Sequence, residues 1–173
     1  MAGLRKGCCY RRIKRAYTRK SKYKYANFVK AVPFSKIVRY EMGDLKKQFS
    51  HRVDLVSRDN VQVRHNALES CRLIVNRNLI AGCGNNYRLQ IRAYPHHVLR
   101  ENKMLTGAGA DRVQTGMQLA FGRAVGIAAQ VRMGKVLMSA SVDEGSIESA
   151  KKSLQKATPR LPGRYAVTWT KVE

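Results

Sequence analysis

Apolar residues recur at every second position in several stretches of the chain, and this pattern predicts strands. Residues 136–142 illustrate it, because Val136, Met138, Ala140 and Val142 are separated by single residues. A period of two is typical of a strand with one face buried against a core. The predicted strands are residues 87–94, 128–133, 136–142 and 165–170, with weaker candidates at 37–42 and 53–56.

Two of these predicted strands are separated by only a short turn. Residues 128–133 and 136–142 flank Gly134 and Lys135, and glycine supplies the backbone freedom that a tight turn needs. Two strand-like runs joined by so short a connection are typical of a β-hairpin. We therefore expect these two strands to pair with each other in an antiparallel arrangement.

Residues 59–81 have helical spacing instead. Their apolar side chains fall on one side of a helix, namely Val61, Leu68, Cys71, Val75 and Leu79. Asp59 is placed to cap this helix, with Gln62 at its third position as in a capping box. The polar side chains off the apolar face are expected to be free to meet a partner, and these are Arg64, Arg72 and Asn76.

A second helix is predicted over residues 145–157, where an apolar stripe ends shortly before Pro159. Helices mixed with antiparallel strands, without regular βαβ repeats, indicate the α+β class. We predict a mainly antiparallel sheet with two helices packed on one side. The predicted organisation is a basic N-terminal arm over residues 1–34 and a single domain over residues 35–173.

Residues 98–123 do not resemble part of a core. Four glycines interrupt any helix there, and no clean period of two is present. A connection of about 25 residues inside a compact domain is unusual, and such loops tend to be functional or disordered. The segment is therefore either a finger that reaches into RNA, because glycine lets a backbone approach a large ligand closely, or a disordered surface loop.

The charge of the chain narrows the choice of partner. Its 173 residues carry 34 Lys and Arg against 11 Asp and Glu, for a formal net charge of +23, and residues 1–30 hold eleven basic residues and no acidic one. So large a charge opposes a compact free protein and suits a polyanion. Nucleic acid is the first candidate and an anionic membrane surface the second, but no predicted helix combines a basic face with an apolar one.

Catalysis and metal binding find little support in the sequence. The glycines at 107 and 109 fail the dinucleotide-binding pattern because position 112 is Arg112, and no Walker motif is present. Cys83 with His96 and His97 could be offered as a nucleophile and base, but nothing places them together. No two cysteines are spaced as C-x-x-C. We therefore predict no catalytic residue, no metal and no cofactor.

The long loop carries a recognisable motif. Residues 100–117 read RENKMLTGAGADRVQTGM and are followed by Ala120-Phe121-Gly122. This run closely resembles the large-subunit ribosomal protein family called L-ten-e in archaea and eukaryotes and L-sixteen in bacteria. The resemblance extends to residues 16–19, 64–69 and 94–100, and so spans most of the chain. Gln118 and Leu119 depart from it, because relatives usually have a basic and then a small residue there.

The resemblance implies a structural protein of the large ribosomal subunit, in the cytoplasm, with no enzymatic activity. It implies binding to large-subunit rRNA between the central protuberance and the stalk base. The long loop, residues 102–116 by position, would point toward the peptidyl-transferase centre and the tRNA sites. The implied partners are rRNA, tRNA in the aminoacyl and peptidyl sites, and neighbouring ribosomal proteins, with no membrane and no small-molecule substrate.

Two sets of residues are predicted to serve this function. The predicted rRNA contacts are Arg5, Lys6, Arg11, Arg12, Lys14, Arg15, Tyr17, Arg19, Lys20, Lys22, Lys24, Arg64, Arg72, His96, His97, Arg100 and Arg123. The predicted tRNA-proximal loop residues are Asn102, Lys103, Met104, Gly107, Gly109, Asp111, Arg112, Gln114 and Gly116. Basic side chains would neutralise phosphates, and arginine can also stack on bases.

Overall fold

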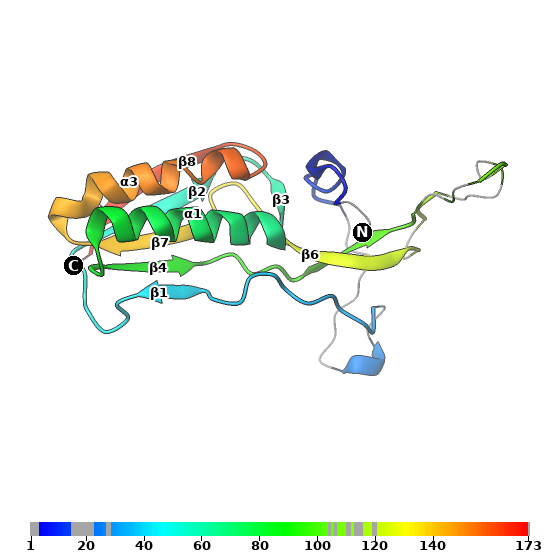
Figure 1. Ribbon diagram of the computed structural model, residues 1–173, viewed down its shortest axis with the longest axis horizontal. Coiled ribbons are helices and arrows are strands. Elements are labelled where there is room, and N and C mark those ends of the chain that lie inside the picture. Colours follow the sequence, from blue (N-terminus) through cyan, green and yellow to red (C-terminus); the bar gives the residue numbers. More distant parts are fainter. Residues whose placement is uncertain are drawn as a thin grey trace.

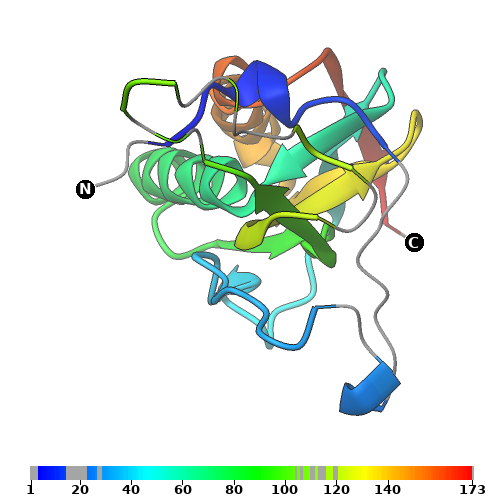
Figure 2. The same ribbon diagram turned by 90° about the vertical axis from the view of Figure 1, so that its right-hand side faces the viewer.

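The computed structural model places two helices on one face of a five-stranded sheet and extends that body with a second, three-stranded sheet (Figures 1 and 2). It describes residues 4–14, 23–26, 29–103, 105, 107–109, 112, 116–118 and 121–172. Every strand pair in both sheets is antiparallel. The predicted α+β class and the placement of two helices on one side of the sheet are therefore confirmed.

The five-stranded sheet has the order β1-β4-β7-β2-β8. Its strands are β1 (Glu41–Gly43), β4 (Tyr87–Ile91), β7 (Val136–Val142), β2 (His51–Ser57) and β8 (Tyr165–Lys171). In β4, Tyr87, Leu89 and Ile91 are buried, while Arg88 and Gln90 between them are only partly covered. Alternation of this kind buries one face of the strand and explains the period of two in its sequence.

The buried face of this sheet packs against α1 (His65–Cys83) and α3 (Ile147–Gln155). The α1 residues that enter the core are Leu68, Cys71, Val75 and Leu79, each with no exposed surface. Burying a side chain such as Leu or Val contributes about 1.5–3 kcal/mol. The core between the helices and the five-stranded sheet is thus the main source of stability, and we call this part of the molecule the body.

The three-stranded sheet has the order β3-β6-β5. Its strands are β3 (Val61–Arg64), β6 (Arg123–Val131) and β5 (His97–Glu101). β6 is the long central strand, and α1 contacts both β3 and β6. The connection from β5 to β6 carries the long loop, whose described parts extend beyond the rest of the molecule (Figure 1).

Within the described part of the chain, four short 3-10 helices lie outside these elements. They are η1 (Gly7–Cys9), η2 (Lys24–Ala26), η3 (Glu144–Ser146) and η4 (Thr158–Arg160). η3 leads into α3, so the helix predicted over 145–157 is confirmed with slightly narrower bounds. η1 belongs to the N-terminal arm.

The predicted start of the first helix was wrong. Residues 61–64 form β3, and α1 begins only at His65. Asp59 does not cap the helix, because its carboxylate accepts a hydrogen bond from the backbone N–H of Arg164 at 2.9 Å. The valines at 61 and 63 are both buried in the strand, so their spacing of two was the correct signal.

The predicted hairpin was also wrong. β6 pairs with β3 and β5, whereas β7 pairs with β2 and β4 in the other sheet. The chain leaves β6 and turns beside the end of β2, where the Ser57 N–H donates to the Lys135 carbonyl and the Gly134 N–H donates to the Ser57 carbonyl. The turn at 134–135 therefore connects two sheets instead of two paired strands.

Candidate nucleic-acid interface

The N-terminal arm packs along the outer edge of β3. The backbone N–H of Gln62 donates to the carbonyl of Arg11 at 2.8 Å, and the Gln62 side-chain amide donates to the carbonyl of Tyr10 at 2.8 Å. Gln130 in β6 donates to the carbonyl of Lys14 at 3.2 Å and to Gln62 Oε1 at 3.3 Å. Gln62 is only 5% exposed, so these hydrogen bonds fix the arm to the sheet at a buried position.

Arg64 forms a second attachment between the arm and the sheet. Its guanidinium lies 5.8 Å from the centre of the Tyr10 ring and donates to the carbonyl of Arg5 at 3.0 Å. Arg5 in turn forms an ion pair with Glu101 at the end of β5, with 3.2 Å between Nε and Oε1. Arg64 is thus engaged with the arm, whereas the sequence had led us to expect it to be free.

A cavity of about 340 Å³ lies between the arm, the start of α1 and strands β5 and β6. Arg5, Arg64 and Lys103 line it together with Tyr10 and His65. Burial raises the pKa of Tyr10, and the charge of Glu101 adds to this. The pKa of His65 is lowered, first by burial and then by the charges of Lys36 and Arg64. Three predicted contact residues therefore meet at one cavity, which the carboxylate of Glu101 also lines.

Several basic residues of the arm keep their charge exposed. Lys6, Arg11, Arg12 and Lys14 are all exposed on the arm, and no acidic side chain of the described residues pairs with them. Exposed, unneutralised cations bind phosphates by releasing counterions from the nucleic acid. We call the region made of residues 4–14, β3, β5, β6 and the described loop residues the loop end.

The base of the long loop is held by the pairing of β5 with β6. Leu99 lies opposite Gly126 and Arg100 opposite Ala124, so the register shifts between these two pairs. Beyond the shift, the Arg100 guanidinium donates to the carbonyl of Phe121 across the loop base. Irregular pairing of this kind bends a strand and increases its twist. The loop therefore leaves the sheet from a fixed base.

The glycine at position 122 is required where the loop rejoins β6. Its φ angle is +106°, and an added Cβ would lie 2.9 Å from the Cε atom of Met117. Farther out, the Arg112 N–H donates to the carbonyl of Gly109 at 3.1 Å, which makes a turn. The described side chains around this turn are exposed, so the outer loop presents its surface to a partner and not to the core.

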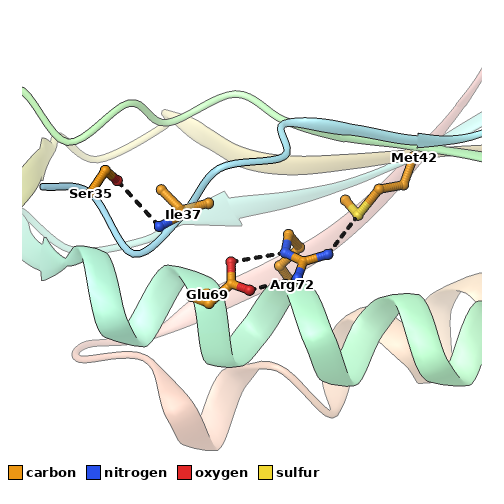
Figure 3. A network of polar contacts seen from close by, with 5 residues as sticks. All are labelled: Ser35, Ile37, Met42, Glu69 and Arg72. Atoms are coloured by element: carbon orange, nitrogen blue, oxygen red, sulfur yellow. Dashed lines mark hydrogen bonds and ion pairs between the residues drawn. The ribbon is translucent and has the colours of Figure 1, made fainter.

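Arg72 occupies a different environment from the other predicted contacts. Its guanidinium makes two hydrogen bonds to the carboxylate of Glu69 and one to the sulfur of Met42 at 3.2 Å (Figure 3). Only 14% of its side chain is exposed. Asn76, which had also been expected to be free, accepts a hydrogen bond from the hydroxyl of Tyr87 at 2.7 Å. Both residues stabilise the body, and their position disfavours an RNA contact by Arg72.

The remaining predicted residues lie at scattered places. His96 is exposed just before β5, His97 begins β5 half-buried, and Arg123 is exposed at the start of β6. Asn102 and Lys103 continue from β5, and Gly107, Gly109, Arg112 and Gly116 lie in the described part of the loop. The predicted residues outside the described part of the chain are Arg15, Tyr17, Arg19, Lys20, Lys22, Met104, Asp111 and Gln114, as is the side chain of Lys24.

Sequence reasoning missed the residues that attach the arm. Gln62 had been assigned to a helix cap, and Gln130 and Glu101 had not been singled out. The alternation of Val61-Gln62-Val63-Arg64 could have revealed a strand, with Gln62 and Arg64 on its polar side. Their partners could not have been found, because they lie more than fifty residues away in the chain.

The described residues offer no other obvious chemistry. They contain no group of three or more His, Cys, Asp and Glu side chains that could hold a metal ion. The cysteines are free thiols, and burial raises the pKa of Cys71 to about 12, so that thiol is not a nucleophile at neutral pH. Within the described chain, no helix is long and apolar enough to cross a membrane.

Comparison with known proteins gives a consistent result. Residues 13–168 match the family described as ribosomal protein L16p/L10e. The chain is 44% identical over 170 residues to the large ribosomal subunit protein uL16 of Methanococcus maripaludis strain S2, covering 97% of this chain and 95% of that one. It is 46% identical to the uL16 proteins of Methanococcus aeolicus, over 92% and 90% of the two chains, and of Picrophilus torridus, over 90% and 86%.

Proposed function

We propose how the arm and the long loop act in the ribosome, since the chain belongs to the L16p/L10e family. It is a structural protein of the large ribosomal subunit and not an enzyme. The arm and the three-stranded sheet bind large-subunit rRNA between the central protuberance and the stalk base. The loop reaches toward the tRNA sites and the peptidyl-transferase centre, and it supports the positioning of tRNA.

The observation that carries this proposal is the arm fixed to the sheet from which the loop projects. Gln62 and Arg64 hold residues 4–14 against β3 by hydrogen bonds to backbone carbonyls. The exposed cations of the arm therefore have a fixed position relative to the loop base. RNA that binds the arm would orient the loop as well, and this coupling supports a positioning role for residues 102–116.

The proposed binding mode follows from the chemistry of these groups. Lys6, Arg11, Arg12 and Lys14 face solvent with no acidic partner among the described residues. Phosphate contacts fix the register and orientation of a protein on nucleic acid. The loop-end cations are proposed to anchor the protein in this way, with Arg100 and Arg123 at the loop base. Arg15, Arg19, Lys20, Lys22 and Lys24 would extend the same contact along the arm.

A sucrose gradient of cell extract in high salt and magnesium tests residence in the ribosome. The chain is expected to migrate with the large subunit through the salt wash. A chain found only at the top of the gradient would contradict the proposal and favour a free nucleic-acid-binding protein. Chemical probing of the rRNA in the washed subunits then locates the contact.

Deleting residues 103–114 tests the role of the loop. We expect the deleted protein to keep its cooperative unfolding and to enter subunits, because the core of the body lies elsewhere. tRNA binding to the resulting ribosomes should be impaired. Thermal melting and tRNA filter binding measure the two effects, and loss of cooperative melting would contradict the division between loop and body.

A further inference from the structure

A row of exposed side chains lies on the segment that connects β4 to β5. Residues 91, 93 and 95 are buried, while Arg92, Tyr94 and His96 are exposed. The backbone turns within this row, because the His96 N–H donates to the carbonyl of Tyr94 at 3.1 Å. The three exposed side chains are one cation followed by two rings, and Tyr94 leaves 50% of its surface exposed.

The two rings belong to a stack of three in which the outer ring is tilted. The ring of Tyr40 lies 5.4 Å from that of Tyr94, with 25° between their planes, and the ring of His96 lies 4.4 Å from Tyr94, with 45° between their planes. These separations match those of stacked or tilted aromatic pairs in proteins. Tyr40 thus forms the inner end of the stack, and the exposed ring of His96 forms its outer end.

The inner end of the stack is held rigidly. The carbonyl of Tyr40 accepts a hydrogen bond from the N–H of Ile91 at 2.8 Å, which fixes the segment to β4. Ile37 on the same segment is only 2% exposed, and its N–H donates to the hydroxyl of Ser35 (Figure 3). On the other side of Tyr40, Met42 contacts Arg72. A stack built on a fixed backbone costs little entropy when a further ring is added.

We propose that Tyr94 and His96 form a stacking platform for an unpaired base of rRNA, with Arg92 at the phosphate beside that base. The inference rests on the proposed function, because it assumes that the chain binds rRNA. Single-stranded RNA is commonly bound by stacking its splayed bases on aromatic or imidazole rings. Arg92 pairs with no acidic side chain among the described residues, so its charge is available for a phosphate.

The geometry favours a base over a purely structural role for the rings. Rings that only fill a core are buried, whereas Tyr94 and His96 are exposed beside a cation. The buried neighbours Ala93 and Pro95 fix the backbone that carries these rings. The two rings can therefore stay exposed and still keep their positions. A flat nucleobase continues such a stack, and a flanking phosphate pairs with the guanidinium of arginine.

The test compares two RNA probes on the full-length protein. One probe is an oligoadenylate of about 12 nucleotides, a length within the site sizes of single-strand-binding proteins, and the other is a fully paired RNA duplex of the same length. The ratio of the two affinities removes the general attraction of a basic protein for phosphate. The variants are His96→Ala, His96→Phe and His96→Lys, with Arg92→Gln as a charge control.

His96→Ala is expected to weaken oligoadenylate binding about tenfold, as loss of one stacked base would. Duplex binding and the dependence of affinity on salt should stay unchanged. His96→Phe should restore binding because it keeps a ring, whereas His96→Lys should not. Arg92→Gln should lower the salt slope by about 0.7, the value for one phosphate contact on a single strand. Unchanged thermal melting confirms that the variants are folded.

Three results would overturn the inference. An unchanged affinity ratio in His96→Ala would show that no base stacks there. Restoration by His96→Lys instead of His96→Phe would show a phosphate contact and not a platform. A wild-type chain that binds neither RNA would overturn the proposed function and this inference with it, whereas wild-type binding with an unchanged ratio would contradict the platform alone.

Discussion

The body and the loop end of this protein differ in how their basic side chains are paired. In the body, six basic side chains form ion pairs with acidic ones, namely Lys47–Asp143, Arg52–Asp54, Arg72–Glu69, Arg88–Glu41, Lys151–Glu148 and Arg164–Asp59. At the loop end, Arg5–Glu101 is the only ion pair between described residues. Ion pairs thus neutralise part of the positive charge in the body, whereas the cations of the arm at Lys6, Arg11, Arg12 and Lys14 stay exposed where we propose that the chain binds RNA.

The comparison shows that stability and binding are assigned to separate parts of the chain. The buried cluster contains residues of α1, α3 and the five-stranded sheet, with only a few from β3 and β6. The loop end instead exposes the arm and the outer loop. Changes in the body should therefore alter the free energy of unfolding, while changes at the loop end should alter binding to RNA. The following predictions test that separation.

The largest effect on stability is expected from a cavity in the body. Leu55→Ala removes a side chain with no exposed surface, which should cost about 2–5 kcal/mol of the free energy of unfolding. Leu73→Ala is a matched control, because Leu73 is 55% exposed on α1 and should change stability by less than about 0.5 kcal/mol. Urea unfolding measures the free energy of unfolding of both variants. Equal losses in the two would contradict the assignment of stability to the buried core of the body.

The largest effect on RNA binding is expected from the arm. Replacing Lys6, Arg11, Arg12 and Lys14 together by Gln removes four exposed cations. The slope of log affinity against log salt should fall by about 3, at roughly 0.7–0.9 for each lost phosphate contact. Filter binding to large-subunit rRNA at several salt concentrations measures the slope. The free energy of unfolding should be unchanged, and a large decrease would mean that these cations stabilise the fold.

A smaller effect is expected where the two parts join. Gln62→Ala removes the side-chain hydrogen bond to the arm and leaves the carbonyl of Tyr10 without that donor. The loss should cost about 1–3 kcal/mol at this buried position. It should also speed hydrogen exchange and proteolysis in residues 4–14. Gln48→Ala, on an exposed glutamine, is the control, and equal protection of the arm in both variants would contradict the role of Gln62.

The smallest effect is expected from pH, through His65. Its pKa in the folded protein is lowered, mainly by burial, so the unfolded chain binds the proton more readily. The contribution of neutral His65 to stability is therefore complete above its unfolded pKa of about 6.5 and declines as the pH falls below it. Urea unfolding between pH 7.5 and 5 should show a steeper decline in the wild type than in His65→Gln, and parallel curves would contradict this.

Most elements of the body could be located from the sequence, because their apolar residues recur with the period of a strand or a helix. β7 coincides with the segment predicted at 136–142. β5 was missed because Val98 and Leu99 are both buried: the pairing is irregular beside them, and irregular pairing removes the period of two. The partners of β6 could not be predicted, because a strand that is covered on both faces gives no indication of its neighbours.

The sequence indicated which types of residue form the candidate site, but it did not indicate how these residues are arranged. The excess of charge in the arm was visible, since residues 1–30 contain no acidic residue. Which arginines are neutralised depends on tertiary partners, as for Arg5 with Glu101. Arg72 is an instructive exception, because Glu69 lies three residues before it on the helix, and this spacing already favours an ion pair.

The attachment of the arm to β3 also bears on the time before the protein meets its RNA. β3 is an outer strand of its sheet, and outer strands with unpaired N–H groups are templates for aggregation with other copies of a chain. The carbonyl of Arg11 occupies one such group, at Gln62, and surrounds that position with positive charge. In a newly synthesised chain, the arm thereby covers part of the edge of β3. The positive charges of the arms repel one another and keep free copies of the protein apart until assembly.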